Sequence, residues 1–168
     1  MIDIIFAILV VVHSSAIALG VGASSVAIAG FLTAIADGTF DPSERRIMGV
    51  VYLSLRIAMG MILVTSAAIL WLDPSFFGSF TAPLWFLMFI LFLNALLMTK
   101  HWIPYTLGPA IQAGTWYTLG FLITIYIFDF ATLNIAVISG FYLADLLLAF
   151  VIVNACMAYL KKRRRRKQ

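Results

Sequence analysis

The sequence IIFAILVVVHSSAIALGVGASSVAIAGFLTAIA, residues 4–36, contains no charged side chain. An apolar segment of about 20 residues is long enough for a helix to cross the hydrocarbon core of a bilayer, which is about 30 Å thick. Four more apolar segments follow, and each ends at charged or turn-forming residues. The sequence therefore predicts an all-α integral membrane bundle of five transmembrane helices.

The expected spans cover residues 4–36, 42–72, 83–99, 107–128 and 134–160, within one transmembrane domain at residues 1–160. Composition agrees, because 64% of the chain is hydrophobic and 11% is charged, whereas soluble domains carry about a quarter charged residues. Small residues at helical spacing in the first span allow close helix packing in lipid. We therefore expect the first span at the centre of the bundle.

The boundaries of the second span carry clear local signals. Asp41, Pro42 and Glu44 form a capping-box pattern at its start. Asp73-Pro74 ends it, because the residue before a proline avoids the helical conformation. The loops of this chain are therefore short and offer no separate soluble domain.

Seven basic residues stand together at positions 161–167, KKRRRRK. This run predicts a basic cytoplasmic tail, residues 161–168, that contacts anionic lipid; we expect no nucleic acid as a partner. Five spans then place the N-terminus outside. The loops with Arg45 and Lys100 fall inside, and those with Asp73 and Asp129 fall outside, as the positive-inside rule requires. The expected location is a bacterial or archaeal plasma membrane.

Three ionisable side chains lie inside the expected spans, and such residues are functional candidates: His13, Arg56 and Asp145. From the helical rise, His13 and Asp145 both lie about 15 Å from the outer boundary, so a His13–Asp145 pair is expected. Arg56 lies about 10 Å deeper. The polar residues expected near that deeper level are Gln112, Asn94 and Asn154.

His13 is also a candidate axial ligand for haem iron, since neutral imidazole is a common haem ligand. Gly20 lies two turns along the same face, where a missing side chain leaves room for a flat macrocycle. Arg56 could meet a haem propionate. His101 lies too far along its own helix to ligate the same iron.

Two motifs carry a family resemblance. The first span reads VVHSSAIALGVGA, in which Gly22 follows His13 by nine residues, and residues 100–112 read KHWIPYTLGPAIQ. Both resemble a family of small, uncharacterised bacterial membrane proteins related to the membrane protoporphyrinogen oxidases and the copper-resistance-D proteins. The resemblance implies that His13 binds haem b and that Gly22 is the glycine of its motif.

Three functions stay open at this point. The first is haem b binding through His13 in a redox or haem-related role, and the second is a small transporter or proton-conducting protein that uses His13, Arg56 and Asp145. The third is a non-catalytic subunit or scaffold of a larger membrane assembly. No standard catalytic motif is present in the sequence. Since the loops are short, we expect a homo-oligomer or a partner membrane subunit.

Overall fold

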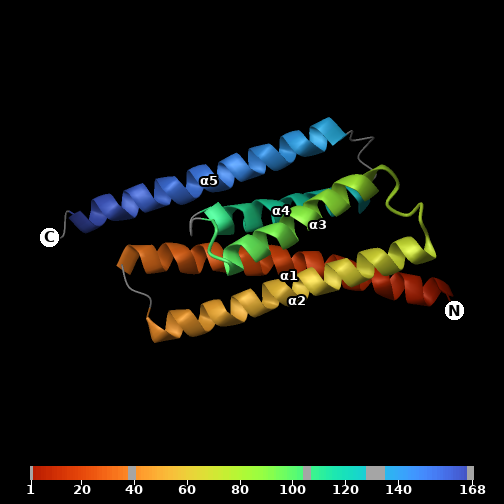
Figure 1. Cartoon of the computed structure of the whole chain (residues 1–168), viewed down its shortest axis with the longest axis horizontal. Helices are drawn as coiled ribbons and strands as arrows, with labels where there is room; N and C mark the ends of the chain where they lie inside the picture. Colours follow the sequence, from red (N-terminus) through yellow and green to blue (C-terminus); the bar gives the residue numbers. More distant parts are fainter. Residues whose placement is uncertain (1, 38–40, 104–106, 128–134, 166–168) are drawn as a thin grey trace.

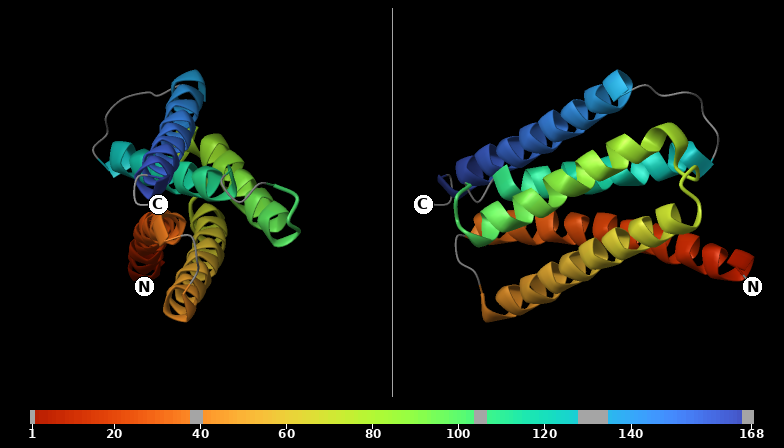
Figure 2. Two further views of the ribbon diagram at one scale, coloured as in Figure 1. Left: turned by 90° about the vertical axis from the view of Figure 1, so that its left-hand side faces the viewer. Right: turned by 45° about the vertical axis from the view of Figure 1, so that its right-hand side comes forward.

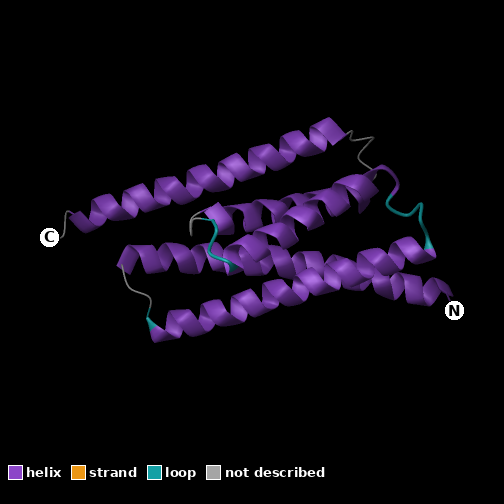
Figure 3. Ribbon diagram, viewed as in Figure 1, coloured by secondary structure: helices purple, strands orange, loops and turns teal. Residues whose placement is uncertain are grey.

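A computed structural model describes residues 2–37, 41–103, 107–127 and 135–165, and these parts of the chain are helical with short connections (Figures 1 and 3). The elements are α1 (Ile2–Asp37), α2 (Pro42–Leu72), the short 3-10 turn η1 (Gly78–Phe80), α3 (Thr81–Thr99), α4 (Leu107–Ile127) and α5 (Ile135–Arg165). The all-α prediction is confirmed, and every helix lies within a few residues of an expected span. Helix α5 continues to Arg165, so the start of the expected basic tail is helical.

Helix α2 begins and ends where its local signals predict. The Asp41 backbone N–H donates to the Glu44 carboxylate at 3.0 Å, which satisfies one of the free donors of a helix start. At the other end, the Asp73 carboxylate accepts hydrogen bonds from the Ser75 hydroxyl at 2.6 Å and from the Ser75 N–H at 2.9 Å. These bonds hold the pKa of Asp73 below its usual range.

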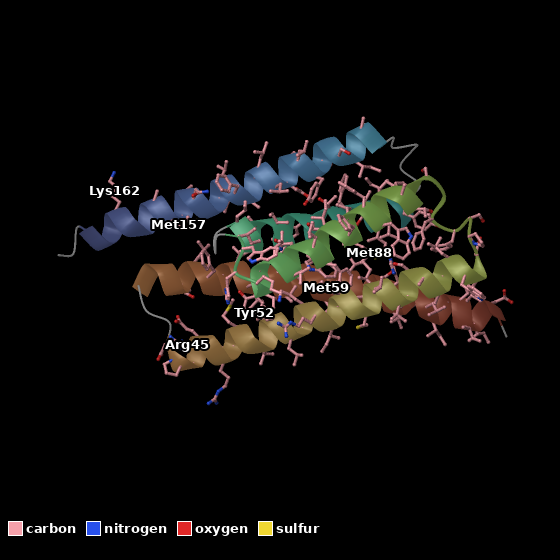
Figure 4. The ribbon with its side chains drawn as sticks, viewed as in Figure 1. Arg45, Tyr52, Met59, Met88, Met157 and Lys162 are labelled. Carbon is pink, nitrogen blue, oxygen red and sulfur yellow. The ribbon has the colours of Figure 1, made fainter. Side chains whose placement is uncertain are left out.

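The helices run roughly along one long axis, and successive helices alternate in direction (Figure 1). Helices α1 and α2 form an antiparallel pair, α3 and α4 pack over it, and α5 packs on α4 and α1 (Figure 2). The two ends of the chain lie at opposite ends of the bundle. Arg45 and Lys162 share the end at which α5 finishes (Figure 4); we call this the basic end.

The outer surface of the bundle is apolar. Among the described residues, four segments are long and apolar enough to cross a membrane; they lie in α1, α2, η1 with α3, and α5. Along α2, large apolar side chains recur on the exposed face at helical spacing, namely Val50, Leu53, Ile57, Val64 and Trp71. Exposed apolar surface of this extent marks a membrane-facing surface, and the chain is an integral membrane protein in architecture.

Helix α4 occupies the centre of the bundle. It contacts α1, α3 and α5, and its Gln112, Thr115, Trp116 and Thr118 are all buried. We expected α1 there because of its small residues. Helix α1 also contacts three helices, α2, α4 and α5, but more of its surface is exposed than that of α4. Helix α4 is not among the four candidate membrane spans of the described residues, and its buried polar side chains contact other helices.

A close approach between α1 and α4 depends on Gly20. A Cβ atom at this position would overlap the indole ring of Trp116, which is fully buried. Helix α1 therefore meets α4 through the bare backbone of Gly20, as small residues allow in membrane bundles. Gly22, two residues on, is exposed and has open space around it.

We predict that Gly20→Ala lowers the stability of the bundle, because the indole has no free volume into which to move. Overpacking of this kind costs about 1–3 kcal/mol. Gly22→Ala is the matched control, and it should leave stability unchanged or raise it, since alanine favours helix over glycine. Thermal unfolding of both variants in detergent checks this. Equal effects of the two substitutions would contradict the packing described here.

Candidate functional site

His13 is buried, with 3% of its surface exposed, and its partner is Thr65 of α2. His13 Nδ1 lies 3.0 Å from Thr65 Oγ1, and the Thr65 hydroxyl donates to the Met61 carbonyl at 2.7 Å. A hydroxyl has a single hydrogen, and the shorter bond uses it. The geometry therefore assigns the hydrogen to Nδ1 of His13, and Nε2 carries the lone pair.

The surroundings of His13 do not fit a haem. The cavity beside it has a volume of about 30 Å³, which holds only one or two water molecules. The face of α1 at Gly20 is filled by the Trp116 indole. Arg56 lies nine residues before Thr65 on α2, about 13 Å along the helix from the level of His13. The expected haem site of His13, Gly20 and Arg56 therefore offers no space for a macrocycle and no propionate partner beside it.

Arg56 instead lines a groove at the level of the α3 C-terminus. The groove has a volume of about 310 Å³, which is at the lower end of the range for small-molecule sites. We refer to it as the inner groove. The residues that line it come from α1, α2, α3, α4 and the turn after α3: Ser24, Ala27, Phe31, Tyr52, Leu55, Arg56, Met59, Ala95, Met98, Thr99, His101, Pro109 and Gln112. Figure 4 labels Tyr52 and Met59, which line it from α2.

The inner groove contains two of the predicted polar residues and touches a third. Arg56 and Gln112 line it, and Asn94 lies behind Gln112. The Asn94 side-chain amide donates to Gln112 Oε1 at 3.1 Å and to the Gly108 carbonyl at 3.0 Å. Asn154 is elsewhere, on α5, where it donates to the Phe150 carbonyl at 2.8 Å. The expected inner polar layer is therefore formed by three of its four members.

Ser24, Tyr52 and Thr99 are polar side chains of the groove that the sequence pattern did not predict as site residues. Of these, Ser24 is the most buried. It is 2% exposed, and its hydroxyl has no hydrogen-bond partner among the described residues. Ser14, Ser15 and Ser25 on the same helix each return their hydroxyl to the carbonyl four residues earlier. Unpartnered buried hydroxyls are rare and require an explanation. A ligand in the inner groove would supply the missing partner.

His101 also lines the inner groove, although the sequence predicted an ordinary interfacial histidine. Its N–H bonds to the Met98 carbonyl at 3.1 Å, and the Trp102 N–H bonds to the Leu97 carbonyl at 3.0 Å, which is the Schellman pattern that ends many helices. Its φ of 57° belongs to the left-handed region, where glycine is usual and other residues cost about 1 kcal/mol. A histidine in place of glycine here marks a position worth testing for function.

Asp145 is half-buried and belongs to the α4–α5 contact. Its carboxylate accepts a hydrogen bond from the Thr118 hydroxyl at 3.1 Å. The Thr115 and Tyr142 hydroxyls lie 3.3 Å apart, one turn away. The expected His13–Asp145 pair is not among the described contacts, because equal depth in the membrane does not place two side chains on facing sides of their helices.

Comparison with protein-family models, with curated proteins and with solved structures finds no match for this chain. The resemblance of the His13 motif to a known family therefore stays a prediction. The same holds for the expected oligomer and for contact of the basic tail with anionic lipid.

We predict that Thr65→Val destabilises the bundle by about 1–3 kcal/mol, because it leaves the buried Nδ1–H of His13 without an acceptor. Thr124→Val is the matched control. Thr124 is an exposed threonine whose hydroxyl bonds only to the Gly120 carbonyl of its own helix. Denaturant unfolding in detergent measures both. If Thr65→Val is no more harmful than Thr124→Val, the His13–Thr65 bond does not stabilise the bundle.

Proposed function

We propose that this chain is a five-span membrane protein that binds a small solute in the inner groove, as a small carrier does. The N-terminus lies outside and the basic end lies in the cytoplasm. The distribution of charge supports this orientation, since Arg45, Arg46, Lys100 and Lys162 belong to helix ends on the basic side, whereas Asp73 follows the other end of α2. In this arrangement α4 also crosses the membrane, which brings the number of spans to five, and its neighbours cover most of its surface.

One observation carries the solute-binding role: Arg56, the only arginine more than five residues from the end of an expected span, lines a groove large enough for a small molecule. Ionisable groups at membrane depth mark substrate pathways in many membrane proteins. Arg56 forms no ion pair within the described part of the chain, and its side chain is exposed. A role that only ties helices together would give Arg56 a buried acidic partner.

The polar side chains of α4 extend this site along the helix. Gln112 lines the inner groove, and Thr115 and Thr118 follow at three-residue intervals, each bonded to a polar partner on α5. Side chains three residues apart on a helix are neighbours. The line of polar groups favours a carrier over a haem protein, and Asp145 lies at its α5 end, bonded to Thr118.

The proposal predicts that water-soluble reagents reach the inner groove from the cytoplasmic side. Cys156 is the only cysteine, so Cys156→Ala gives a background without thiols. In that background, Ala95→Cys on the groove wall should react with a charged thiol reagent applied from inside. The thiolate is the reactive form, and it forms in water and not in lipid.

Leu96→Cys is the matched control, because it lies one residue along the same helix and is exposed on the outer surface, away from the groove. Its thiol should react at least tenfold more slowly than that of Ala95→Cys, an order-of-magnitude expectation for a lipid-facing position. Equal rates, or a faster reaction of Leu96→Cys, would mean that the groove is closed to water. The solute-binding proposal would then fail.

A further inference from the structure

Three polar side chains of the inner groove, Arg56, Gln112 and Ser24, offer hydrogen-bond donors to a ligand. Tyr52, Thr99 and His101 also line the groove, and the Thr99 hydroxyl already donates to the Ala95 carbonyl at 2.8 Å. Arg56 contributes a guanidinium, which is a permanent cation with donors only. Gln112 Oε1 already accepts from Asn94, so this side chain presents its NH₂ group, whose recorded partner is the weak acceptor Met59 Sδ at 4.0 Å. Ser24 adds a buried hydroxyl without a partner. A ligand that suits these groups is an acceptor with negative charge.

The groove offers nothing to balance a cationic ligand. None of the described residues that line it is aspartate or glutamate. The nearest acidic side chain inside a span, Asp145, is bonded to Thr118 and does not line the groove. A buried cation without a carboxylate would be costly, whereas a carboxylate or phosphate can pair with the planar fork of Arg56 through two hydrogen bonds.

The remaining walls are apolar. Ala27, Phe31, Leu55, Ala95 and Met98 line the groove beside the donors. Met98 is a flexible side chain that can adapt to a hydrocarbon chain. The volume of about 310 Å³ suits one short chain and excludes the two acyl chains of a membrane lipid.

We infer that the inner groove binds a small single-chain amphipathic anion, with its carboxylate or phosphate on Arg56, Gln112 and Ser24 and its alkyl chain on the apolar wall. This inference rests on the proposed function and names the class of its solute. The ligand enters from the basic end, where the inner leaflet meets the cytoplasm. Lys100 and the basic end of α5, which includes Lys162, attract anions toward the groove, and the basic residues at this end outnumber Asp41 and Glu44 there.

Octanoate is the probe for this inference, and the wild-type protein in nanodiscs of neutral lipid is the sample. Calorimetric titration should show saturable binding of octanoate. Octanol has the same chain without the charge and should bind roughly tenfold or more weakly. Octyl phosphate should bind comparably to octanoate. Equal binding of octanol and octanoate would overturn the inference, as would the absence of octanoate binding.

Variants assign the anion to its residues. Arg56→Gln should weaken octanoate binding roughly 10- to 100-fold, and Arg56→Lys should recover part of it because the charge returns without the planar fork. Arg46→Gln is the matched control, since Arg46 is exposed on the same helix and does not line the groove. Thermal unfolding shows whether Arg56→Gln still folds. If that variant is unfolded, Ser24→Ala is the deciding variant, and it should weaken octanoate affinity a few-fold. Full binding by both Arg56→Gln and Ser24→Ala would overturn the inference.

Two further comparisons distinguish failure of the anion inference from failure of the solute-binding proposal, and a lipid headgroup from a free anion. If Ala95→Cys reacts but octanoate does not bind, the groove is an open site for another solute, and only the present inference is wrong. If octanoate binding falls when anionic lipid replaces neutral lipid in the nanodisc, the lipid headgroup competes for Arg56 and is the source of the anion. Unchanged affinity in anionic lipid supports a free single-chain anion.

Discussion

Polar groups inside a bilayer must find their partners within the protein, because the hydrocarbon core offers none. In this chain the requirement falls on α4, which carries Gln112, Thr115 and Thr118 into the bundle. The other helices enclose it and present apolar side chains outward. Thr115 and Thr118 bond to α5, and Gln112 bonds to α3. The positions of α3 and α5 beside α4 therefore match the hydrogen bonds that its polar side chains make.

The inner groove is one place where the described residues do not meet that requirement; Asn94 Oδ1 and the Trp116 indole N–H are also buried without a partner. Ser24 has no partner in the described structure, and the NH₂ group of Gln112 faces only a sulfur atom. Arg56 lines the same space. Unsatisfied donors cost free energy when water is excluded. Such donors lower the stability of the bundle but are available to bind a ligand. The left-handed backbone of His101, at the edge of the groove, likewise costs stability at a position that can serve function.

The helices could be predicted from the sequence because charge-free segments and proline boundaries act locally. The limits of α2, Pro42 and Leu72, follow from its capping residues. The contacts between helices could not be predicted, because depth along an axis does not fix the direction of a side chain around it. His13 and Asp145 share a depth but bond to Thr65 and Thr118. Threonine is common in membrane helices, and neither partner stands out in the sequence.

The sequence of α4 contains a partial signal for its enclosed position in the bundle. Its polar residues Gln112, Thr115 and Thr118 are all buried, and a helix with such a row of polar side chains needs protein partners for them. Ser24 gave no signal, because the sequence cannot show which serine hydroxyl lacks a carbonyl partner. The haem hypothesis treated Gly20 as free space, whereas the structure fills that space with Trp116. A glycine predicts a close approach but does not say what approaches.

The account depends most on α4 as a fifth, enclosed span, and the sidedness of the two chain ends tests this directly. Reporters fused before Met1 and after Gln168 should give activity on opposite sides of the membrane, with the second reporter in the cytoplasm. Reporters on the same side would mean an even number of spans. That result would remove α4 from the membrane and, with it, the inner groove proposed here.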